Sequence, residues 1–197
     1  MIEDIFPTRI SRWDLSDHPQ LTLARQIAEN IAKEPHGLID GARSSYATGL
    51  TASFLRKPLI QSLTQEIHRC INLHAEQVGL PTINIGHSWV NIMGQGQRVE
   101  RHRHELSVLS GAFYLSAPPG SCGLKFHSPT AGLRMLELVN NAGPETTTNF
   151  HFTECREGEL IIFPSWLEHS TDLNQADGRI VVSFNTQYKD YTFTATS

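Results

Sequence analysis

A series of short β-type segments after residue 82 constrains the fold of this 197-residue chain most strongly. Six short β-type runs follow one another, separated by Gly, Pro, Ser and Asn, with no helical pattern between them. They are residues 83–93, 99–106, 108–116, 122–128, 158–166 and 179–194. Many short strands in succession predict an antiparallel sandwich or barrel.

The first part of the chain has a different period. Two helices are predicted, and the first is capped by Asp17 with its apolar stripe on Leu23, Ile27 and Ile31. The second begins near Pro58, and its stripe recurs at three- and four-residue steps from Ile60 to Val78. Residues 38–56 are small and polar and predict an irregular excursion. We therefore expect a single α+β domain over residues 1–197 that is mainly β. A helical layer (residues 1–81) would pack on a β-barrel core (residues 82–197).

Composition and charge exclude several functional classes. The net charge is −4 and there is no long basic run, so no nucleic-acid partner is expected. No apolar run reaches about 18 residues, which argues against a membrane partner, and residues 1–15 resemble neither a secretory nor a transit peptide. The three cysteines are far apart and predict reduced thiols in a cytoplasmic protein. A homodimer remains open.

Histidine is the residue type that points to chemistry. In an extended segment alternate side chains share a face, so His102 and His104 would point together while Glu105 points away. His169 follows the strong strand 158–163 and a breaking proline. Neutral imidazole is a common ligand of iron, zinc and copper, so we expect His102, His104 and His169 to hold one metal ion.

Arg179 begins the last β-type run, ten residues after His169. In the alternation of a strand it shares its face with Ser183. The planar guanidinium binds carboxylates bidentately, so we expect Arg179, with Ser183, to hold a small anionic cosubstrate near the metal.

The motifs around these residues resemble the iron(II)/2-oxoglutarate-dependent oxygenases. The likeness is to a group known mainly from bacteria and phages, related to prolyl hydroxylase-like enzymes. The matching blocks are Phe6-Pro7-Thr8, Trp89-Val90-Asn91, His102-Arg103-His104, Ser110 through Leu115, Glu157 through His169, and Arg179 through Asn185. The resemblance implies a double-stranded β-helix (a jelly-roll, cupin-like barrel) with N-terminal helices packed against it, and Fe(II) and 2-oxoglutarate as cofactors.

The resemblance also implies roles for single residues. His102 and His169 match the two histidines that bind iron, and Arg179 matches the arginine that binds the distal carboxylate of 2-oxoglutarate. Tyr114 matches a tyrosine that assists this arginine, and Asn91 matches an asparagine that contacts the cosubstrate in one branch of the superfamily.

His104 departs from the usual pattern, because most of the superfamily carries an aspartate there. Three neutral histidines leave Fe(II) with a net charge of about +2, rather than the about +1 that a carboxylate leaves. The expected activity is a 2-oxoglutarate-dependent dioxygenase. Such an enzyme would use O₂ to hydroxylate an unactivated C–H bond of an amino acid, peptidyl or small-metabolite substrate, with release of succinate and CO₂.

Two alternatives are open from the sequence. Gly96 with His102 and His104, and Gly158 with Pro164 and His169, also match much of the cupin pattern. That pattern would suit a three-histidine dioxygenase that does not use 2-oxoglutarate. A non-catalytic metal-binding barrel is the other alternative.

Overall fold

A computed structural model describes residues 3, 5–36, 39–46, 53–134 and 149–188 of the chain. Ten strands and two α-helices lie within these residues. The helices are α1 (Leu21–Ile31) and α2 (Gln61–Gln77). The strands are β1 (Ser11–Asp14), β2 (Glu34–Pro35), β3 (Arg43–Ser44), β4 (Ile83–Met93), β5 (Leu109–Ser116), β6 (Lys125–His127), β7 (Phe150–Phe152), β8 (Glu159–Pro164), β9 (His169–Ser170) and β10 (Arg179–Tyr188). Three 3₁₀ turns, Phe54–Arg56, Pro58–Ile60 and Ala131–Arg134, complete these elements.

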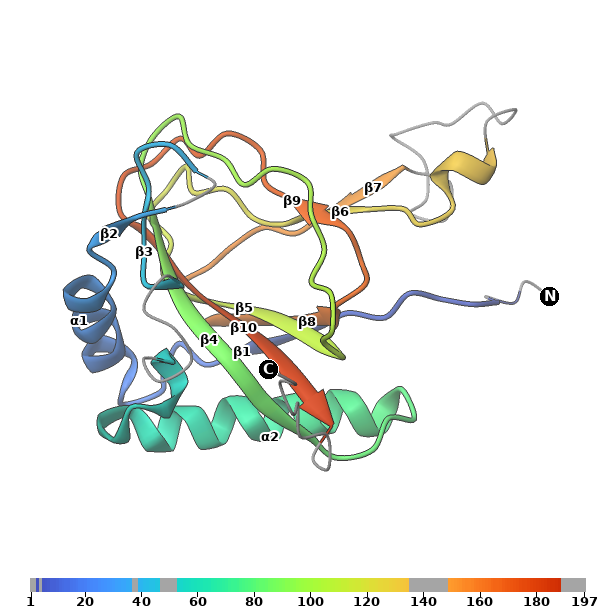
Figure 1. Cartoon of the computed structure of the whole chain (residues 1–197), viewed down its shortest axis with the longest axis horizontal. Helices are drawn as coiled ribbons and strands as arrows, with labels where there is room; N and C mark the ends of the chain where they lie inside the picture. The colour runs from blue at the N-terminus through green and yellow to red at the C-terminus, as the bar shows by residue number, and fades with distance from the viewer. Residues whose placement is uncertain (1–2, 4, 37–38, 47–52, 135–148, 189–197) are drawn as a thin grey trace, which may run out of the picture.

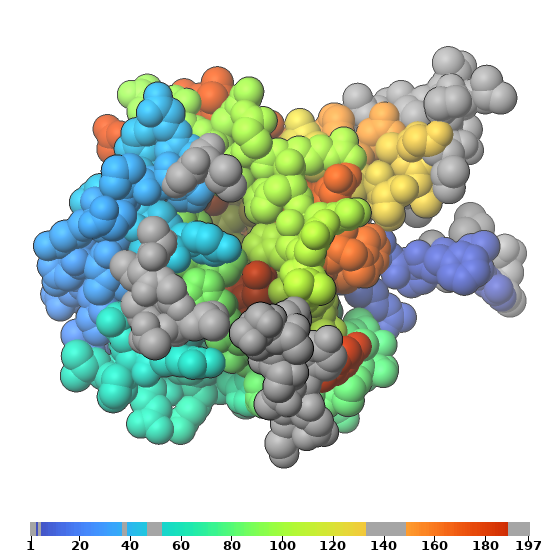
Figure 2. Space-filling model, in the orientation of Figure 1, coloured from blue at the N-terminus to red at the C-terminus, as the bar shows by residue number. Residues whose placement is uncertain are grey.

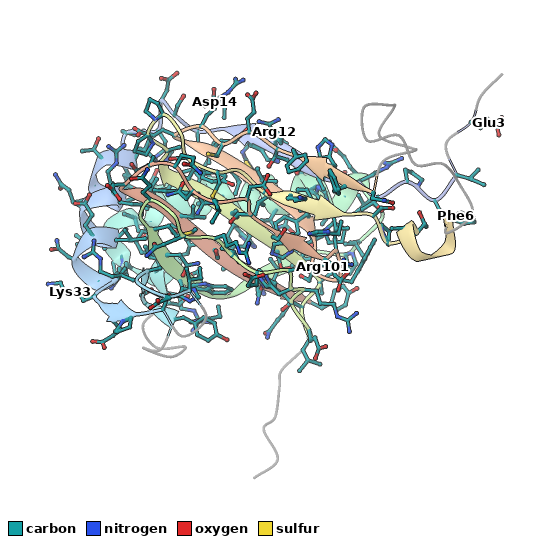
Figure 3. The ribbon with its side chains drawn as sticks, turned by 90° about the horizontal axis from the view of Figure 1, so that it is seen from above. Glu3, Phe6, Arg12, Asp14, Lys33 and Arg101 are labelled. Atoms are coloured by element: carbon teal, nitrogen blue, oxygen red, sulfur yellow. The ribbon has the colours of Figure 1, made fainter. Side chains whose placement is uncertain are left out.

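Two antiparallel sheets make up the β part, as the sequence predicts. The larger has seven strands in the order β1-β8-β5-β10-β4-β3-β2, and the smaller has the order β7-β6-β9. β1 forms one edge of the larger sheet, and its Arg12 and Asp14 lie at an edge of the molecule (Figure 3). In Figure 1 the helices lie on one side of the larger sheet and the smaller sheet lies on the other.

Each face of the larger sheet has its own core. The face toward the helices packs β-branched and aromatic side chains, such as Val182 and Phe184 of β10, against Ile67 and Ile71 of α2. The opposite face carries a second cluster that continues onto the smaller sheet, made by Ala112, Tyr114, Leu124, Phe126, Ile161, Phe163, Leu167 and Val181. This second face is the one on which the predicted site residues lie.

The helices differ from the prediction in one respect. α2 buries the expected apolar stripe from Leu63 to His74. α1 begins at Leu21 instead of being capped by Asp17, because residues 15–18 close a turn in which His18 N–H donates to the carbonyl of Leu15. The fully buried residues of α1 are Leu21, Ala24 and Ala28. Of the predicted stripe, Ile27 and Ile31 are partly buried against the core, whereas Leu23 is exposed.

The predicted strand over residues 99–106 is wrong. The segment forms one isolated bridge, between His102 and His169, and no ladder. Single backbone hydrogen bonds hold it at separate points, from His104 N–H to Ser165 O and from Thr171 N–H to Val99 O. Leu106 then takes a positive φ of 58°, which turns the chain away before a strand can continue.

The N-terminal part is more than a helical layer, because β1, β2 and β3 all extend the larger sheet. The excursion predicted over 38–56 contains β3 and the 3₁₀ turn Phe54–Arg56 in its described part. Residues 135–148, between the 3₁₀ turn Ala131–Arg134 and β7, lie outside the described part of the chain. None of the described helices is both long enough and apolar enough to cross a membrane.

Candidate metal centre

The three predicted histidines converge on one point between the two sheets. One ring nitrogen from each of His102, His104 and His169 lies within 4.8 Å of the other two. The ring centroids are 4.3 Å apart for His102 and His169, and 5.2 Å apart for His104 and His169. Although residues 99–106 form no regular strand, His102 and His104 still share a side, and Glu105 points outward to an ion pair with Arg103, as predicted.

The outer nitrogen of each ring is already engaged. His102 Nδ1 lies 2.8 Å from the carbonyl of Glu100, and His169 Nδ1 lies 3.0 Å from the carbonyl of Leu167. A carbonyl only accepts, so both Nδ1 atoms carry the proton and both Nε2 atoms carry a lone pair. His104 Nδ1 lies 2.5 Å from Oδ1 of Asn185. Metal-binding histidines in proteins are held in this way.

The inner nitrogens suit a cation. Nε2 of His102 and Nε2 of His104 are 3.2 Å apart. Burial lowers the pKa of His104 to about 4 and that of His169 to about 3, in both cases chiefly by desolvation, with the neighbouring His102 lowering them further. The two imidazoles are therefore neutral at pH 7, which is the protonation state a metal requires.

Arg179 lies at the start of β10 and is 3% exposed. Its Nε donates to the carbonyl of Cys122 at 2.8 Å, and Nη1 contacts Sδ of Met93 at 3.2 Å. Among the described residues, no carboxylate forms an ion pair with this guanidinium. A buried cation without an anionic partner indicates a place for an anionic ligand.

Tyr114 supports the same interpretation. Its ring lies 5.2 Å from Cζ of Arg179, because β5 pairs Tyr114 with Val181 of β10. The phenol is fully buried, and its oxygen has no hydrogen-bond partner in the described structure. Burial raises the pKa of Tyr114, so the group remains a neutral O–H donor.

Asn91 and Ser183 lie on the same face of the larger sheet. The amide of Asn91 is 2.8 Å from Oγ of Ser44 and 3.4 Å from Oγ of Ser183. Next to them, the indole of Trp89 stacks on the imidazole of His104 with centroids 5.8 Å apart. The structure thus brings Asn91 and Ser183 together on the face that carries Arg179.

The two segments that carry the three histidines meet at the surface of the molecule. Figure 2 shows the yellow-green segment 99–108 beside the orange segment 165–172. Arg101 lies on the outside of the first segment (Figure 3) and forms an ion pair with Glu168 of the second segment. Arg101 directly precedes His102 in the chain, and Glu168 directly precedes His169. The pair is exposed, so it contributes little to stability.

Sequence reasoning missed the residues that hold His104 in place. Asn185 lies on the same strand face as Arg179 and Ser183, and it ends the block Arg179 through Asn185, so the alternation and the resemblance were the two signals that could have identified it. Ser110 and Ser165 adjoin it and are fully buried. Both serines lie in blocks that match the family, but nothing in their spacing indicates that they would meet at Asn185.

Three solved structures are similar to the chain in fold. HygX from Streptomyces hygroscopicus, with nickel, 2-oxoglutarate and hygromycin B bound, superposes with a TM-score of 0.63 at 11% identity, covering 94% of this chain and 85% of HygX. SnoN, a non-heme alpha-ketoglutarate-dependent epimerase from nogalamycin biosynthesis, gives 0.65 at 12%, covering 91% and 78%. A Pseudomonas putida prolyl-4-hydroxylase gives 0.55 at 14%, covering 91% and 92%. These likenesses confirm the predicted double-stranded β-helix.

No curated protein matches the sequence significantly. A family model described as "Putative 2OG-Fe(II) oxygenase" matches residues 87–185, half of the chain. The match spans all three histidines and Arg179, and it agrees with the resemblance seen in the motifs. The chain belongs to this family of 2-oxoglutarate- and iron(II)-dependent oxygenases.

Proposed function

We propose that His102, His104 and His169 hold the Fe(II) of this oxygenase. The observation that carries the proposal is the convergence of three ring nitrogens, two of them with lone pairs fixed by backbone carbonyls, beside a buried arginine that lacks an anionic partner. Three protein ligands leave positions open for an oxoacid and O₂. When bound, the iron supplies the activation of O₂ that is coupled to decarboxylation of 2-oxoglutarate.

Arg179 and Tyr114 bind the distal carboxylate of 2-oxoglutarate in this proposal. The guanidinium has five N–H groups, of which Nε and one on Nη1 are directed at Cys122 and Met93. The rest of the planar group is available to a carboxylate, and the partnerless Tyr114 hydroxyl is a further donor. Burial excludes water from both groups, which strengthens a charge-assisted hydrogen bond there.

Asn91 and Ser183 complete the cosubstrate side of the pocket. Both present polar atoms from the face that carries Arg179, Asn91 from β4 and Ser183 from β10. Their role is to orient the oxoacid between the arginine and the histidines. Both side chains are neutral, so in this proposal the positive charge that pairs with the distal carboxylate is that of Arg179.

The substrate is a small molecule or a peptidyl side chain that reacts with O₂ through hydroxylation of an unactivated C–H bond. Trp89 stacks on His104 and thereby gives the metal side of the site an aromatic surface against which the substrate would lie. We place the protein in the cytoplasm, where its three cysteines remain free thiols.

Anaerobic addition of Fe(II) and 2-oxoglutarate tests the function. The expected result is the weak visible metal-to-ligand charge-transfer band of a chelated oxoacid, and succinate on exposure to O₂. Absence of both would contradict the proposal and favour a metal-binding barrel without turnover. The cupin alternative is tested by Arg179→Ala. Loss of 2-oxoglutarate consumption with metal retained supports the oxygenase, whereas unchanged oxidation of a substrate without 2-oxoglutarate supports the cupin chemistry.

A further inference from the structure

Asn185 is the side chain that holds the ring of His104. It lies near the end of β10, where the register pairs it with Ser110 of β5. Its Oδ1 is 2.5 Å from Nδ1 of His104 and 2.8 Å from Oγ of Ser110. Asn185 is half-buried, and its amide joins a ligand from the 99–108 segment to the centre of the larger sheet.

The hydrogen-bond directions follow from counting protons. An amide oxygen only accepts, so it takes the hydroxyl proton of Ser110 and the Nδ1 proton of His104. The Ser110 oxygen must then accept from Ser165, whose Oγ lies 2.8 Å away. Both serines are fully buried, so bulk water does not compete for these bonds. In this arrangement the oxygen end of the Asn185 amide faces both His104 and Ser110.

His104 differs from the other two ligands in how it is held. His102 and His169 are oriented by backbone carbonyls, which cannot change role. His104 alone among the three is oriented by a side chain, and it also occupies the position where a carboxylate is usual. A carboxylate needs no control of tautomer, but an imidazole coordinates through Nε2 only if the proton sits on Nδ1.

We propose that Asn185 is the positioning residue that makes His104 a metal ligand. This inference rests on the metal centre proposed above. The amide oxygen keeps the proton of His104 on Nδ1, so that the Nε2 lone pair faces the same point as those of His102 and His169. Asn185 thereby orients the ring of the histidine at the second ligand position. An aspartate at that position would be shorter and would not require such a partner.

The opposite orientation of the Asn185 amide would place the proton of His104 on the other ring nitrogen. Turned by half a rotation, Asn185 would donate its N–H to Nδ1 of His104, and the ring proton would move to Nε2. That proton would point at Nε2 of His102, 3.2 Å away, and would occupy the lone pair that a metal needs. The two arrangements are therefore distinguished by the tautomer of a single ring.

The first test uses the wild-type protein with ¹⁵N-labelled histidine and Zn(II) alone as a diamagnetic probe. We expect the ¹⁵N shifts of His104 to show coordination through Nε2 and a proton on Nδ1. The same experiment on Asn185→Asp should show the same coordination, because a carboxylate oxygen also accepts from Nδ1. Coordination of His104 through Nδ1, or no zinc-induced shift at His104, would overturn the proposal.

The second test measures the dissociation constant for Zn(II) by competition with a chelator. Asn185→Leu keeps the shape but removes the acceptor, and we expect zinc binding to weaken by about 10- to 100-fold, the usual effect of losing such a partner. Asn185→Asp should bind zinc at least as tightly as wild type. Asn72→Leu is the control, because Asn72 is a half-buried amide whose hydrogen bonds go to the backbone of Ile83 and His68 and to none of the three proposed ligands. It should lower the melting temperature and leave zinc affinity unchanged.

Unchanged zinc affinity in Asn185→Leu would overturn the inference. If Asn185→Leu does not fold, the ¹⁵N spectra of the wild type and of Asn185→Asp still test whether His104 coordinates zinc through Nε2. Neither measurement uses 2-oxoglutarate or turnover, so the proposed function can fail separately. A wild-type protein that binds zinc through the Nε2 of His104 but gives no charge-transfer band with Fe(II) and 2-oxoglutarate would contradict the proposed function alone.

Discussion

Replacement of Arg179 should change cosubstrate affinity and protein stability in different ways. In Arg179→Met the long apolar side chain fills most of the same volume, while the charge and all N–H donors disappear. Hydrogen bonds to a charged group contribute about 1.5–3 kcal/mol each. Loss of the arginine–carboxylate contact should therefore weaken 2-oxoglutarate binding by roughly 10- to 100-fold, at about 1.4 kcal/mol for each factor of ten.

The stability of the ligand-free protein should change little. Arg179 is 3% exposed and has no carboxylate partner among the described residues, so its removal relieves a desolvation cost and leaves no opposite charge behind. The carbonyl of Cys122 loses its donor, which costs about 1 kcal/mol. The two effects oppose each other, and we expect the free energy of unfolding to stay within about 1 kcal/mol of wild type or to rise.

The assay is an anaerobic titration of 2-oxoglutarate into the Fe(II)-loaded protein, followed by the charge-transfer band, with urea unfolding of the ligand-free protein measured in parallel. Arg179→Lys keeps the charge without the planar fork and should give an intermediate affinity. If Arg179→Met binds 2-oxoglutarate within about threefold of wild type, a difference well below that of one charged hydrogen bond, the role assigned to Arg179 is refuted. A large loss of stability would show instead that the arginine has a structural partner.

Three further predictions address neighbouring groups. Tyr114→Phe should leave the ligand-free protein as stable as wild type, because the hydroxyl it removes has no partner, yet weaken 2-oxoglutarate binding by about 5- to 10-fold in the same titration; equal affinity would exclude the hydroxyl from the site. In the metal-free protein, His104 and His169 have pKa values of about 4 and about 3, below the roughly 6.5 of an unfolded chain. Between pH 6.5 and pH 4 the unfolded state then binds more protons than the folded state, so the free energy of unfolding should fall by roughly a few kcal/mol as the pH drops through this range. A free energy of unfolding, measured with urea, that does not change over this range would contradict the prediction. Gly111→Ala would place Cβ 2.1 Å from the Phe184 ring and should destabilise by about 1–3 kcal/mol or more, whereas Gly132→Ala, which meets nothing within 4 Å, should melt as wild type does.

The sequence predicts well what depends on regular periodicity. Strand β4 and the buried stripe of α2 follow from alternating and three-to-four-residue patterns, and both are confirmed. The segment around His102 was less predictable, because single contacts to residues 165 and 169 replace a ladder. The start of α1 was also missed, since the turn before it is fixed by backbone hydrogen bonds that no residue type signals strongly.

The candidate site, like the fold, could be predicted from the sequence only in part. The residue types and their order identify the three histidines, and the structure brings them to one point. Asn185 and Ser110 lie in blocks that match the family, but their hydrogen bonds with each other and with His104 were not predictable, because these contacts form only when β5 and β10 pair in register. Among the described residues, Arg179 lacks a carboxylate partner and the Tyr114 hydroxyl lacks any hydrogen-bond partner, and both facts result from packing that no sequence pattern contains.

A crystal structure of the anaerobic protein with Fe(II) and 2-oxoglutarate tests the central claim most directly. The account predicts iron bonded to the Nε2 atoms of His102, His104 and His169. It also predicts that the oxoacid chelates the iron and that its distal carboxylate lies on Arg179 and Tyr114. Iron that leaves His104 uncoordinated, or an oxoacid whose distal carboxylate lies away from Arg179, would contradict it.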